Sequence, residues 1–195
     1  MKRIFDLLFS FLGLLILFPF LLIIAILIVI DSKGDIFYLQ QRVGKENKDF
    51  NIFKFRTMRP NSDKQGLLTV GAKDRRITRI GMFLRKYKID ELPQLINVLI
   101  GNMSFVGPRP EVRKYVDLYN SEQKKVLTVK PGITDYASIE YSKENELLAK
   151  SENPEKTYIE EIMPAKLELN LKYIKEASLL TDIKIIFKTF VKIVS

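Results

Sequence analysis

Two adjacent carboxylates, Asp90 and Glu91, begin an apolar-patterned segment, and Arg109, which lies between two prolines, follows them in the sequence. The chain has no histidine and no cysteine. Histidine bases, thiolate nucleophiles, Cys/His zinc sites and disulfides are therefore excluded. If the chain is an enzyme, carboxylates must supply its nucleophile and its base, while lysine, arginine or a hard cation handles negative charge.

The residues after the acidic pair predict a helix that begins near Asp90. Pro93 is tolerated only in a first turn, and the apolar residues nearby have the spacing of a buried helical face. These residues are Leu92, Leu95, Ile96 and Leu99. A helix N-terminus favours an ionised carboxylate, which suits a nucleophile or a metal ligand, and it can also receive a phosphate. A structural N-cap is the alternative for Asp90.

Two other sequence features place cations where they can meet negative charge. In a predicted strand, period-two alternation puts Lys54 and Arg56 on one face and aromatic residues on the other. A solvated sheet surface is the alternative for these two cations. Pro108 and Pro110 stiffen the loop around Arg109, and a fixed guanidinium suits bidentate phosphate recognition, with a structural salt bridge as the alternative.

The N-terminus predicts a membrane anchor. Leu7–Ile30 contains no charged residue and, at a helical rise of ~1.5 Å, is long enough to cross the hydrocarbon core. Pro19 predicts a kink next to Phe18, and a straight span would leave Lys2 on one side of the membrane and the basic remainder on the other. We therefore expect a re-entrant helix with both ends on the cytoplasmic face. A straight transmembrane helix and a signal peptide are the alternatives.

The charge pattern of the remaining chain favours a membrane surface. The formal net charge is +9, which indicates an anionic partner. Residues 76–88 and 183–194 combine apolar residues at helical spacing with many cations, as in helices that lie on anionic membranes. An ordinary surface helix is the alternative for each. Together with the anchor, these stretches favour a membrane-face protein over a nucleic-acid binder.

The expected fold class is α+β, with a helix-break-helix anchor over residues 1–33 and a small mixed domain with interfacial amphipathic helices over residues 34–195. Arg3 and Asp6 lie on one face of the first helix and can pair there, with a solvated pair of head-group charges as the alternative. The other expected elements are strands at 36–41 and 50–58, a polar connection at 43–48, loops at 59–75 and 101–110, a helix at 111–125 and a tight turn at 130–134.

Four segments occur in a fixed order along the chain. They are Lys54–Met58, Asp90–Leu99, Met103–Pro110 and Lys130–Thr134. In this order they resemble the bacterial sugar transferases, or monotopic phosphoglycosyl transferases, and the resemblance runs from Lys2 to the C-terminus. It implies transfer of a sugar 1-phosphate from a UDP-sugar to undecaprenyl phosphate, which gives a lipid diphosphosugar and UMP. We expect the minimal catalytic form, without the extra N-terminal membrane domain of larger members.

The resemblance also assigns residue roles. Asp90 would attack the sugar-linked phosphorus, form a covalent phosphosugar intermediate and expel UMP, and Glu91 would assist proton removal from the lipid phosphate. Mg²⁺, held partly by Asp90, would offset phosphoryl charge. The substrate-binding residues would be Lys54, Arg56, Pro108 and Arg109, with Lys54 and Arg109 on the diphosphate oxygens. Phe18 and Pro19 would form the break in the re-entrant membrane helix.

The resemblance further implies the inner membrane, with the catalytic domain on its cytoplasmic face. Expected partners are the UDP-sugar, undecaprenyl phosphate and membrane lipid, without nucleic acid; a homodimer stays open. Many members carry Gly-Trp-Ala-Gln and then Asn-Gly-Arg where this chain has Asp135–Tyr141, a candidate sugar or uracil contact region, so donor specificity does not carry over. A membrane-bound scaffold without catalysis is the alternative, and it predicts that Asp90→Asn leaves all function intact.

Overall fold

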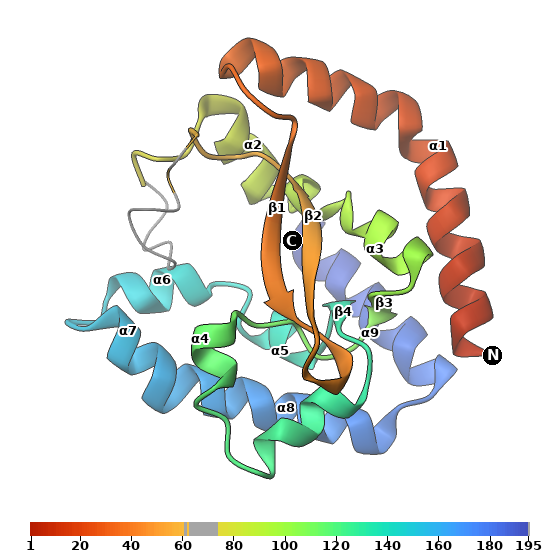
Figure 1. Ribbon diagram of the computed structural model, residues 1–195, viewed down its shortest axis with the longest axis vertical. Coiled ribbons are helices and arrows are strands. Elements are labelled where there is room, and N and C mark those ends of the chain that lie inside the picture. The colour runs from red at the N-terminus through yellow and green to blue at the C-terminus, as the bar shows by residue number, and fades with distance from the viewer. Residues whose placement is uncertain (61, 63–73, 195) are drawn as a thin grey trace.

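The computed structural model describes residues 1–60, 62 and 74–194, so most of the loop predicted at 59–75 lies outside the described residues. The fold is mixed α+β, with one long N-terminal helix and two small sheets (Figure 1). The helices are α1 (Lys2–Asp31), α2 (Arg79–Lys86), α3 (Gln94–Ile100), α4 (Arg113–Val116), α5 (Tyr136–Glu140), α6 (Glu144–Ala149), α7 (Pro154–Thr157), α8 (Met163–Glu176) and α9 (Leu179–Val194). The strands are β1 (Phe37–Val43), β2 (Asp49–Phe55), β3 (Ser104–Val106) and β4 (Gly132–Thr134). Short 3₁₀ segments are η1 (Lys45–Asn47), η3 (Ile89–Glu91) and η4 (Gln123–Thr128), and η5 (Tyr158–Ile162) is a π-helical segment.

The predicted first pair of strands is confirmed as the antiparallel hairpin β1–β2. Its register pairs Phe37 with Phe55 and Val43 with Asp49. The predicted polar connection contains η1, where Glu46 and Asn47 have φ angles of 59° and 60°. Side chains alternate along β2, so Phe55 is buried and Lys54 points to the opposite face. The packing of the apolar face therefore fixes the position of Lys54.

A second sheet occupies two segments that the sequence predicts as a loop and a tight turn. β3 and β4 pair in parallel, with Ser104 opposite Gly132 and Val106 opposite Thr134. The backbones meet closely at two glycines, since a Cβ atom on Gly132 would lie 2.1 Å from the nitrogen of Gly107. The predictions of an irregular loop at 101–110 and a turn at 130–134 are therefore wrong over these residues, because strands this short carry little periodicity.

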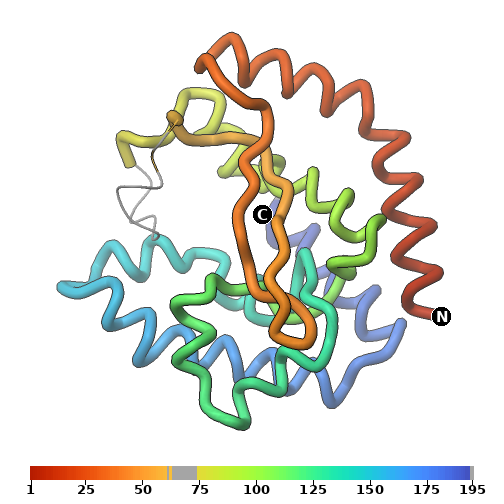
Figure 2. Tube along the Cα trace, in the orientation of Figure 1, coloured from red at the N-terminus to blue at the C-terminus, as the bar shows by residue number. Residues whose placement is uncertain are grey.

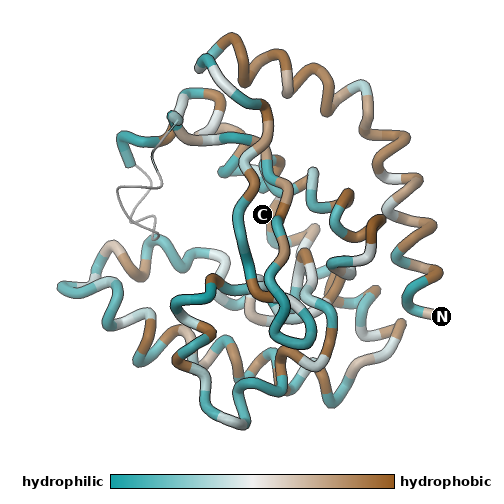
Figure 3. Tube along the Cα trace, in the orientation of Figure 1, coloured by the Kyte–Doolittle hydropathy of each residue, from teal (hydrophilic) through white to brown (hydrophobic). Residues whose placement is uncertain are grey.

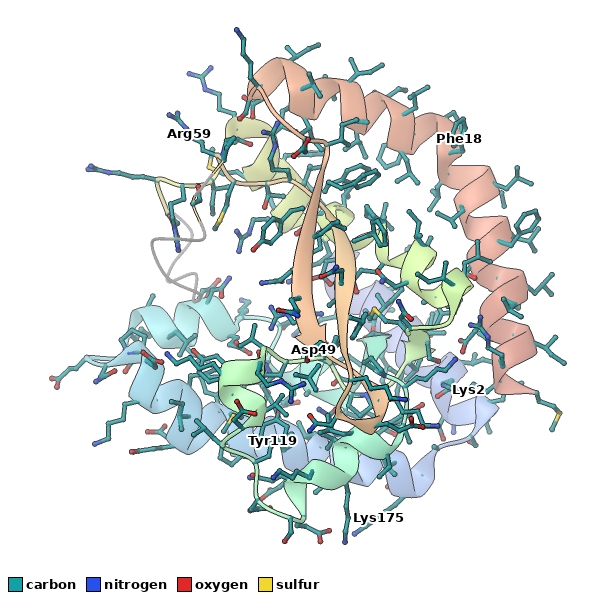
Figure 4. The ribbon with its side chains drawn as sticks, in the orientation of Figure 1. Lys2, Phe18, Asp49, Arg59, Tyr119 and Lys175 are labelled. Atoms are coloured by element: carbon teal, nitrogen blue, oxygen red, sulfur yellow. The ribbon has the colours of Figure 1, made fainter. Side chains whose placement is uncertain are left out.

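The expected helix-break-helix over residues 1–33 is wrong in one respect, because α1 is a continuous helix without a break at Phe18 and Pro19. It changes direction near its middle (Figure 1), close to the residue labelled Phe18 in Figure 4. Pro19 lies inside the helix and removes a backbone donor, which accounts for the bend. Among the described residues, α1 is the one helix long and apolar enough to cross a membrane. Hydrophobic residues follow one another along most of it (Figure 3), and Ile16 and Phe18 are 72% and 64% exposed.

Both ends of α1 are bound to the folded part of the chain. Arg3 donates to the carbonyl oxygens of Val98 and Leu99, at 2.6 and 2.9 Å. At the other end, the carboxylate of Asp31 accepts the N–H of Ile80 at 2.9 Å and so holds the start of α2.

The predicted pair between Arg3 and Asp6 is wrong. Asp6 is 3% exposed and accepts instead from Ser104 Oγ and the N–H of Phe105, at 3.1 and 3.2 Å. Each charge therefore serves a contact with the folded domain, whose carbonyl and N–H groups compete better than a neighbour on the same helix.

The predicted helix at 111–125 shortens to α4, because the chain turns at Asn120 and Gln123, which exchange hydrogen bonds between their side chains and backbone N–H groups. The expected inward residues are nevertheless buried or half-buried. They are Val112, Tyr115, Val116 and Tyr119, and they join a core with α8 and η5. Figure 2 shows α4 to one side of the hairpin and α8 running beneath it, and α8 reaches the start of α1, where Lys2 donates to the hydroxyl of Tyr173 at 3.1 Å.

Candidate active site

The acidic pair lies in a tight turn and not in the first turn of a long helix. Lys88 adopts a left-handed conformation with φ of 56°, η3 follows, and α3 begins only at Gln94. Pro93 has no N–H to donate and stands at the N-cap of α3. The helix predicted to begin near Asp90 therefore begins four residues later, although the acidic pair still precedes it directly.

The face of α3 that is buried also differs from the predicted one. Leu95 is buried as expected, whereas Leu92, Ile96 and Leu99 are only half-buried. Asn97, which was not predicted to be buried, is fully buried. Its side chain accepts the N–H of Phe53 at 2.9 Å and donates to the carbonyl of Asn51 at 2.7 Å. These two hydrogen bonds fix β2 against α3 and thereby hold Lys54 close to the acidic pair.

Glu91 is saturated by cations. Both of its oxygens accept from the guanidinium of Arg109, with one N–O distance of 3.2 Å, and Lys54 Nζ lies 3.4 Å from Oε1. Burial opposes the charge on Glu91, but the attraction of Arg109 and Lys54 holds its pKa well below the usual range. In turn, Glu91 raises the pKa of Arg109. These three residues form a half-buried network of opposite charges.

Asp90 differs from its neighbour. Its Oδ1 atom is buried and has no hydrogen-bond partner among the residues that the structure describes. Burial, together with the charge on Glu91, raises the pKa of Asp90. The expectation that a helix N-terminus favours its ionised form is wrong here, because desolvation in the turn outweighs the local backbone field. Asp90 is therefore a comparatively basic carboxylate with a free oxygen, as a nucleophile or ligand requires.

The acidic pair opens into a cavity of about 810 Å³, which is the size of pocket that holds a cofactor-sized ligand. Cations dominate the wall around the two carboxylates. They are Arg42, Lys54, Arg85, Lys86, Lys88 and Arg109. The cavity extends from there to α5, α6, α8 and α9. Its charge makes one end suited to a phosphate or diphosphate group.

Two predicted binding residues lie away from this cavity. The guanidinium of Arg56 is buried and donates to the carbonyl oxygens of Ser32 and Lys33, just after α1. Pro108 is buried beneath the loop, where its carbonyl accepts the N–H of Gly132 at 3.1 Å. Neither residue lines the large cavity, whereas Arg109 and Pro110 do. The cavity is thus lined by Asp90, Glu91, Lys54 and Arg109. Arg56 and Pro108 make structural contacts elsewhere.

Some residues at the site escaped the sequence interpretation. Arg42 Nη1 lies 2.8 Å from Glu111, whose other oxygen accepts from the hydroxyl of Tyr158. Asp135 is fully buried and accepts the backbone N–H of Arg109 at 3.0 Å. The sequence signals were that Arg42 directly follows the strand predicted at 36–41, that Glu111 follows Pro110, and that Asp135 begins the candidate contact region Asp135–Tyr141.

Comparisons with known proteins identify the family of the chain. The model of the bacterial sugar transferase family matches residues 1–195. A UDP-N-acetylgalactosamine-undecaprenyl-phosphate N-acetylgalactosaminephosphotransferase of Aeromonas hydrophila is 39% identical over 191 residues, which cover 96% of this chain and 42% of that protein. A UDP-glucose:undecaprenyl-phosphate glucose-1-phosphate transferase of Escherichia coli is 36% identical, over 98% of this chain and 40% of that protein. The exopolysaccharide production protein PSS of Rhizobium leguminosarum is 38% identical, over 98% of this chain and 94% of that protein.

The chain belongs to the bacterial sugar transferase family. It spans about two fifths of the length of the Aeromonas and Escherichia proteins, since it matches 42% and 40% of them. The match covers both the apolar helix α1 and the site around Asp90, so the family extends over this helix and the charged cavity alike.

A bacterial sugar transferase is expected to use Mg²⁺, and one feature of the site fits a hard cation. The unpartnered carboxylate oxygen of Asp90 is a ligand type that Mg²⁺ prefers. No group of three carboxylates is present among the described residues, so the protein alone offers no cage. Mg²⁺ is commonly held by one or two carboxylates together with substrate phosphates and water.

Proposed function

We propose that this protein transfers a sugar 1-phosphate from a UDP-sugar to undecaprenyl phosphate, as the first membrane step in the synthesis of a bacterial glycoconjugate. The observation that carries the proposal is the contrast within the acidic pair: Glu91 is occupied by Arg109 and Lys54, whereas Asp90 keeps a buried oxygen without a partner. The names of the Aeromonas and Escherichia relatives, which describe such transfers, support it.

In the first step, a carboxylate oxygen of Asp90 attacks the sugar-linked phosphorus of the donor. A phosphorus–oxygen bond forms to Asp90, the bond to the UMP phosphate breaks, and UMP leaves with the electron pair. In the second step, a phosphate oxygen of undecaprenyl phosphate attacks the same phosphorus and releases the carboxylate of Asp90. The product is the lipid diphosphosugar, and Asp90 returns to its starting state.

The cations around the acidic pair bind and orient the diphosphate. Arg109 is fixed by Glu91 and by the loop with Pro110, so its guanidinium is held in place before substrate arrives. Lys54 comes from β2 on the other side of Glu91 and adds a point charge. Mg²⁺, when bound at Asp90, would supply further neutralisation of phosphoryl charge.

The base role of Glu91 stays a prediction. Both of its oxygens accept from Arg109, and its low pKa makes it a weak proton acceptor in this arrangement. To take a proton from the lipid phosphate, Glu91 must first exchange one of these partners for the substrate. The arriving phosphate is itself a partner for Arg109 and Lys54, which is how such an exchange would occur.

The same proposal includes a re-entrant anchor in the bacterial inner membrane, with the site on the cytoplasmic face. Arg3 and Asp31, near the two ends of α1, both contact the folded domain, and the bend at Pro19 lies between them. If straight, a 30-residue helix would extend about 45 Å, which would carry one end across the hydrocarbon core. Contacts at both ends therefore support a helix that enters and leaves on one side.

Release of UMP tests the reaction. The purified protein in detergent is mixed with Mg²⁺ and a panel of UDP-sugars, with and without undecaprenyl phosphate. The covalent mechanism predicts a burst of about one UMP per enzyme without the lipid and continuous release with it. Release that strictly requires the lipid would contradict the covalent step. Silence across the panel would favour a membrane-bound scaffold.

Cysteine labelling tests the topology, because the native chain has no cysteine. One variant carries a cysteine at position 2, next to Met1, and a second variant carries a cysteine in place of the exposed Lys33. The re-entrant helix predicts that a membrane-impermeant reagent labels both from the cytoplasmic side. Labelling of the first cysteine from the periplasmic side would mean a true span. Sedimentation of the same preparations would test a homodimer, which stays a prediction.

A further inference from the structure

α9 carries two rows of apolar side chains that meet at Phe190. The first row is exposed and consists of Ile183, Phe187 and Phe190, which are spaced four and three residues apart on one face of the helix. The second row, Ile186, Phe190 and Ile193, has the same spacing and lines the large cavity. Because Phe190 belongs to both rows, the exposed apolar face of α9 continues into the wall of the cavity.

The first turn of α9 is fixed beside the N-terminal end of α1 (Figure 1). Asp182 on α9 pairs with Lys2 on α1. The hydroxyl of Tyr173 accepts from Lys2 at 3.1 Å and donates to Asp182 at 2.6 Å. In the proposed topology, this end of α1 lies where the chain enters the membrane. α9 therefore starts at the membrane surface, where its exposed apolar face can contact lipid.

Cations line the same cavity beside the second apolar row. Lys192 directly precedes Ile193 on α9, and Lys86 and Lys88 line the cavity from the end of α2 and the turn before the acidic pair. Cations also outnumber carboxylates among the residues that line the cavity. The cavity therefore combines positive charge with an apolar wall that reaches the protein surface, which suits a molecule with an anionic head and a long apolar chain.

The two substrates of the proposed reaction reach the site from different surroundings. A UDP-sugar is soluble in water, whereas the long polyprenyl chain of undecaprenyl phosphate stays in the bilayer because its transfer to water is unfavourable. The phosphate of this acceptor must therefore move from the membrane into the cavity past an apolar surface. A face of α9 that only adsorbed to lipid would have no need to continue into the cavity wall.

We propose that Ile186, Phe190 and Ile193 form the entrance through which undecaprenyl phosphate reaches the active site from the membrane. The first part of the polyprenyl chain stays against these three side chains, while the phosphate lies among the cations of the cavity. The inference rests on the proposed function and adds to it the side of the cavity from which the acceptor comes. Phe187, which is exposed but does not line the cavity, contacts only the surrounding lipid.

The test compares Phe190→Ser with Phe187→Ser. The two phenylalanines lie on the same helix and are 67% and 66% exposed, but of the two only Phe190 lines the cavity. Each variant is reconstituted in vesicles of phosphatidylethanolamine and phosphatidylglycerol that contain increasing amounts of undecaprenyl phosphate. The KM for undecaprenyl phosphate is measured from continuous UMP release, and the burst of UMP is measured in vesicles without the acceptor. Flotation of the vesicles measures membrane binding.

The entrance predicts a selective effect of one substitution. Phe190→Ser should raise the KM for undecaprenyl phosphate roughly tenfold, because the polyprenyl chain loses an aromatic contact. The burst without acceptor should keep its wild-type amplitude, because the donor does not pass α9. Phe187→Ser should keep the wild-type KM. Both variants should float with the vesicles to the same extent and keep the wild-type Tm, since neither side chain is buried.

Other outcomes overturn the entrance. An equal rise in KM in both variants would mean that α9 only adsorbs to the membrane, and an unchanged KM in both would mean that the acceptor enters elsewhere. A smaller burst in Phe190→Ser with an unchanged KM for the acceptor would assign Phe190 to the donor. In all three cases the wild type still releases UMP, so the proposed function stands. A wild type that releases no UMP from any donor would overturn the proposed function and the entrance together.

Discussion

Two buried clusters of charge differ in how completely their atoms are paired. In the first, which we name the N-terminal clamp, Lys2 meets both Asp182 and the hydroxyl of Tyr173, and Asp182 uses its second oxygen to accept from Tyr173 at 2.6 Å. Asp182 is 2% exposed. In the second, Glu91 is paired in the same way, but Asp90 beside it keeps an oxygen without a partner.

The difference indicates which cluster holds the fold together and which performs chemistry. A buried ion pair with all its hydrogen bonds made gains little from a ligand, and removing one member leaves the other unpaired. An unpaired carboxylate oxygen destabilises the fold slightly and remains available for phosphorus or a cation. Each cluster contains a buried aspartate, Asp182 or Asp90, and completeness of pairing is the feature that separates these two carboxylates.

The strongest test of this comparison is Asp90→Asn. Amide nitrogen cannot replace the carboxylate as a nucleophile, so UMP release should fall by at least about 10³-fold, while the circular dichroism spectrum and Tm stay close to those of the wild type. Asp117→Asn, at a side chain that is 62% exposed, serves as the control and should keep full activity. A variant of Asp90 with more than a tenth of wild-type activity would end its assignment as the nucleophile.

Glu91→Gln should have the next largest effect. A neutral side chain cannot pair with both Arg109 and Lys54, so the binding cations lose their fixed positions and the rate of UMP release should fall on the order of 10²-fold. The covalent site itself remains, so the burst of UMP without lipid should still occur, only more slowly. Complete absence of the burst, in a folded variant, would mean that Glu91 carries the phosphosugar itself.

Asp182→Asn probes the clamp, where the expected effect is on stability. The substitution leaves Lys2 without its carboxylate, and because Lys2 is 41% exposed we expect a loss of only about 1–2 kcal/mol in the free energy of unfolding. UMP release per folded molecule should not change. Glu122→Gln is the matched control, since the pair with Lys125 is exposed on both sides and should contribute less than about 0.5 kcal/mol. Equal losses in the two variants would contradict a stabilising clamp.

The two clusters differ in what the sequence could predict about them. The family resemblance names Lys54, Asp90, Glu91 and Arg109 as residues of one site, and in the structure Lys54 and Arg109 both pair with Glu91 next to Asp90, while their catalytic and binding roles stay predictions. The clamp could not be predicted, since Lys2 and Asp182 meet only when the first and last helices are packed. β3 and β4 were missed for the same reason: their pairing depends on close contact between two glycines far apart in sequence.

The pKa of Asp90 is another property that the local sequence does not predict. Its place before a helix suggested an ionised carboxylate, yet its pKa is raised because the folded chain buries it. Burial is a property of the assembled domain, so a local pattern gives the wrong direction. The bend of α1 is the opposite case, because a proline inside an apolar helix is a local cause and the sequence was sufficient to predict it.

The smallest expected effect concerns the pH dependence of donor binding through Lys54. Burial lowers the pKa of Lys54, and the charges of Arg109 and Arg42 lower it further against the attraction of Glu91. Lys54 therefore loses its proton at a lower pH than an ordinary lysine, and the KM for the donor should begin to rise correspondingly early as the pH increases. Lys54→Arg keeps its charge throughout this range, so its KM should stay level where that of the wild type rises. Lys48→Arg, at a side chain 78% exposed, should retain the wild-type profile. An alkaline rise in KM that persists in Lys54→Arg would place the titrating group elsewhere and remove Lys54 from the diphosphate site.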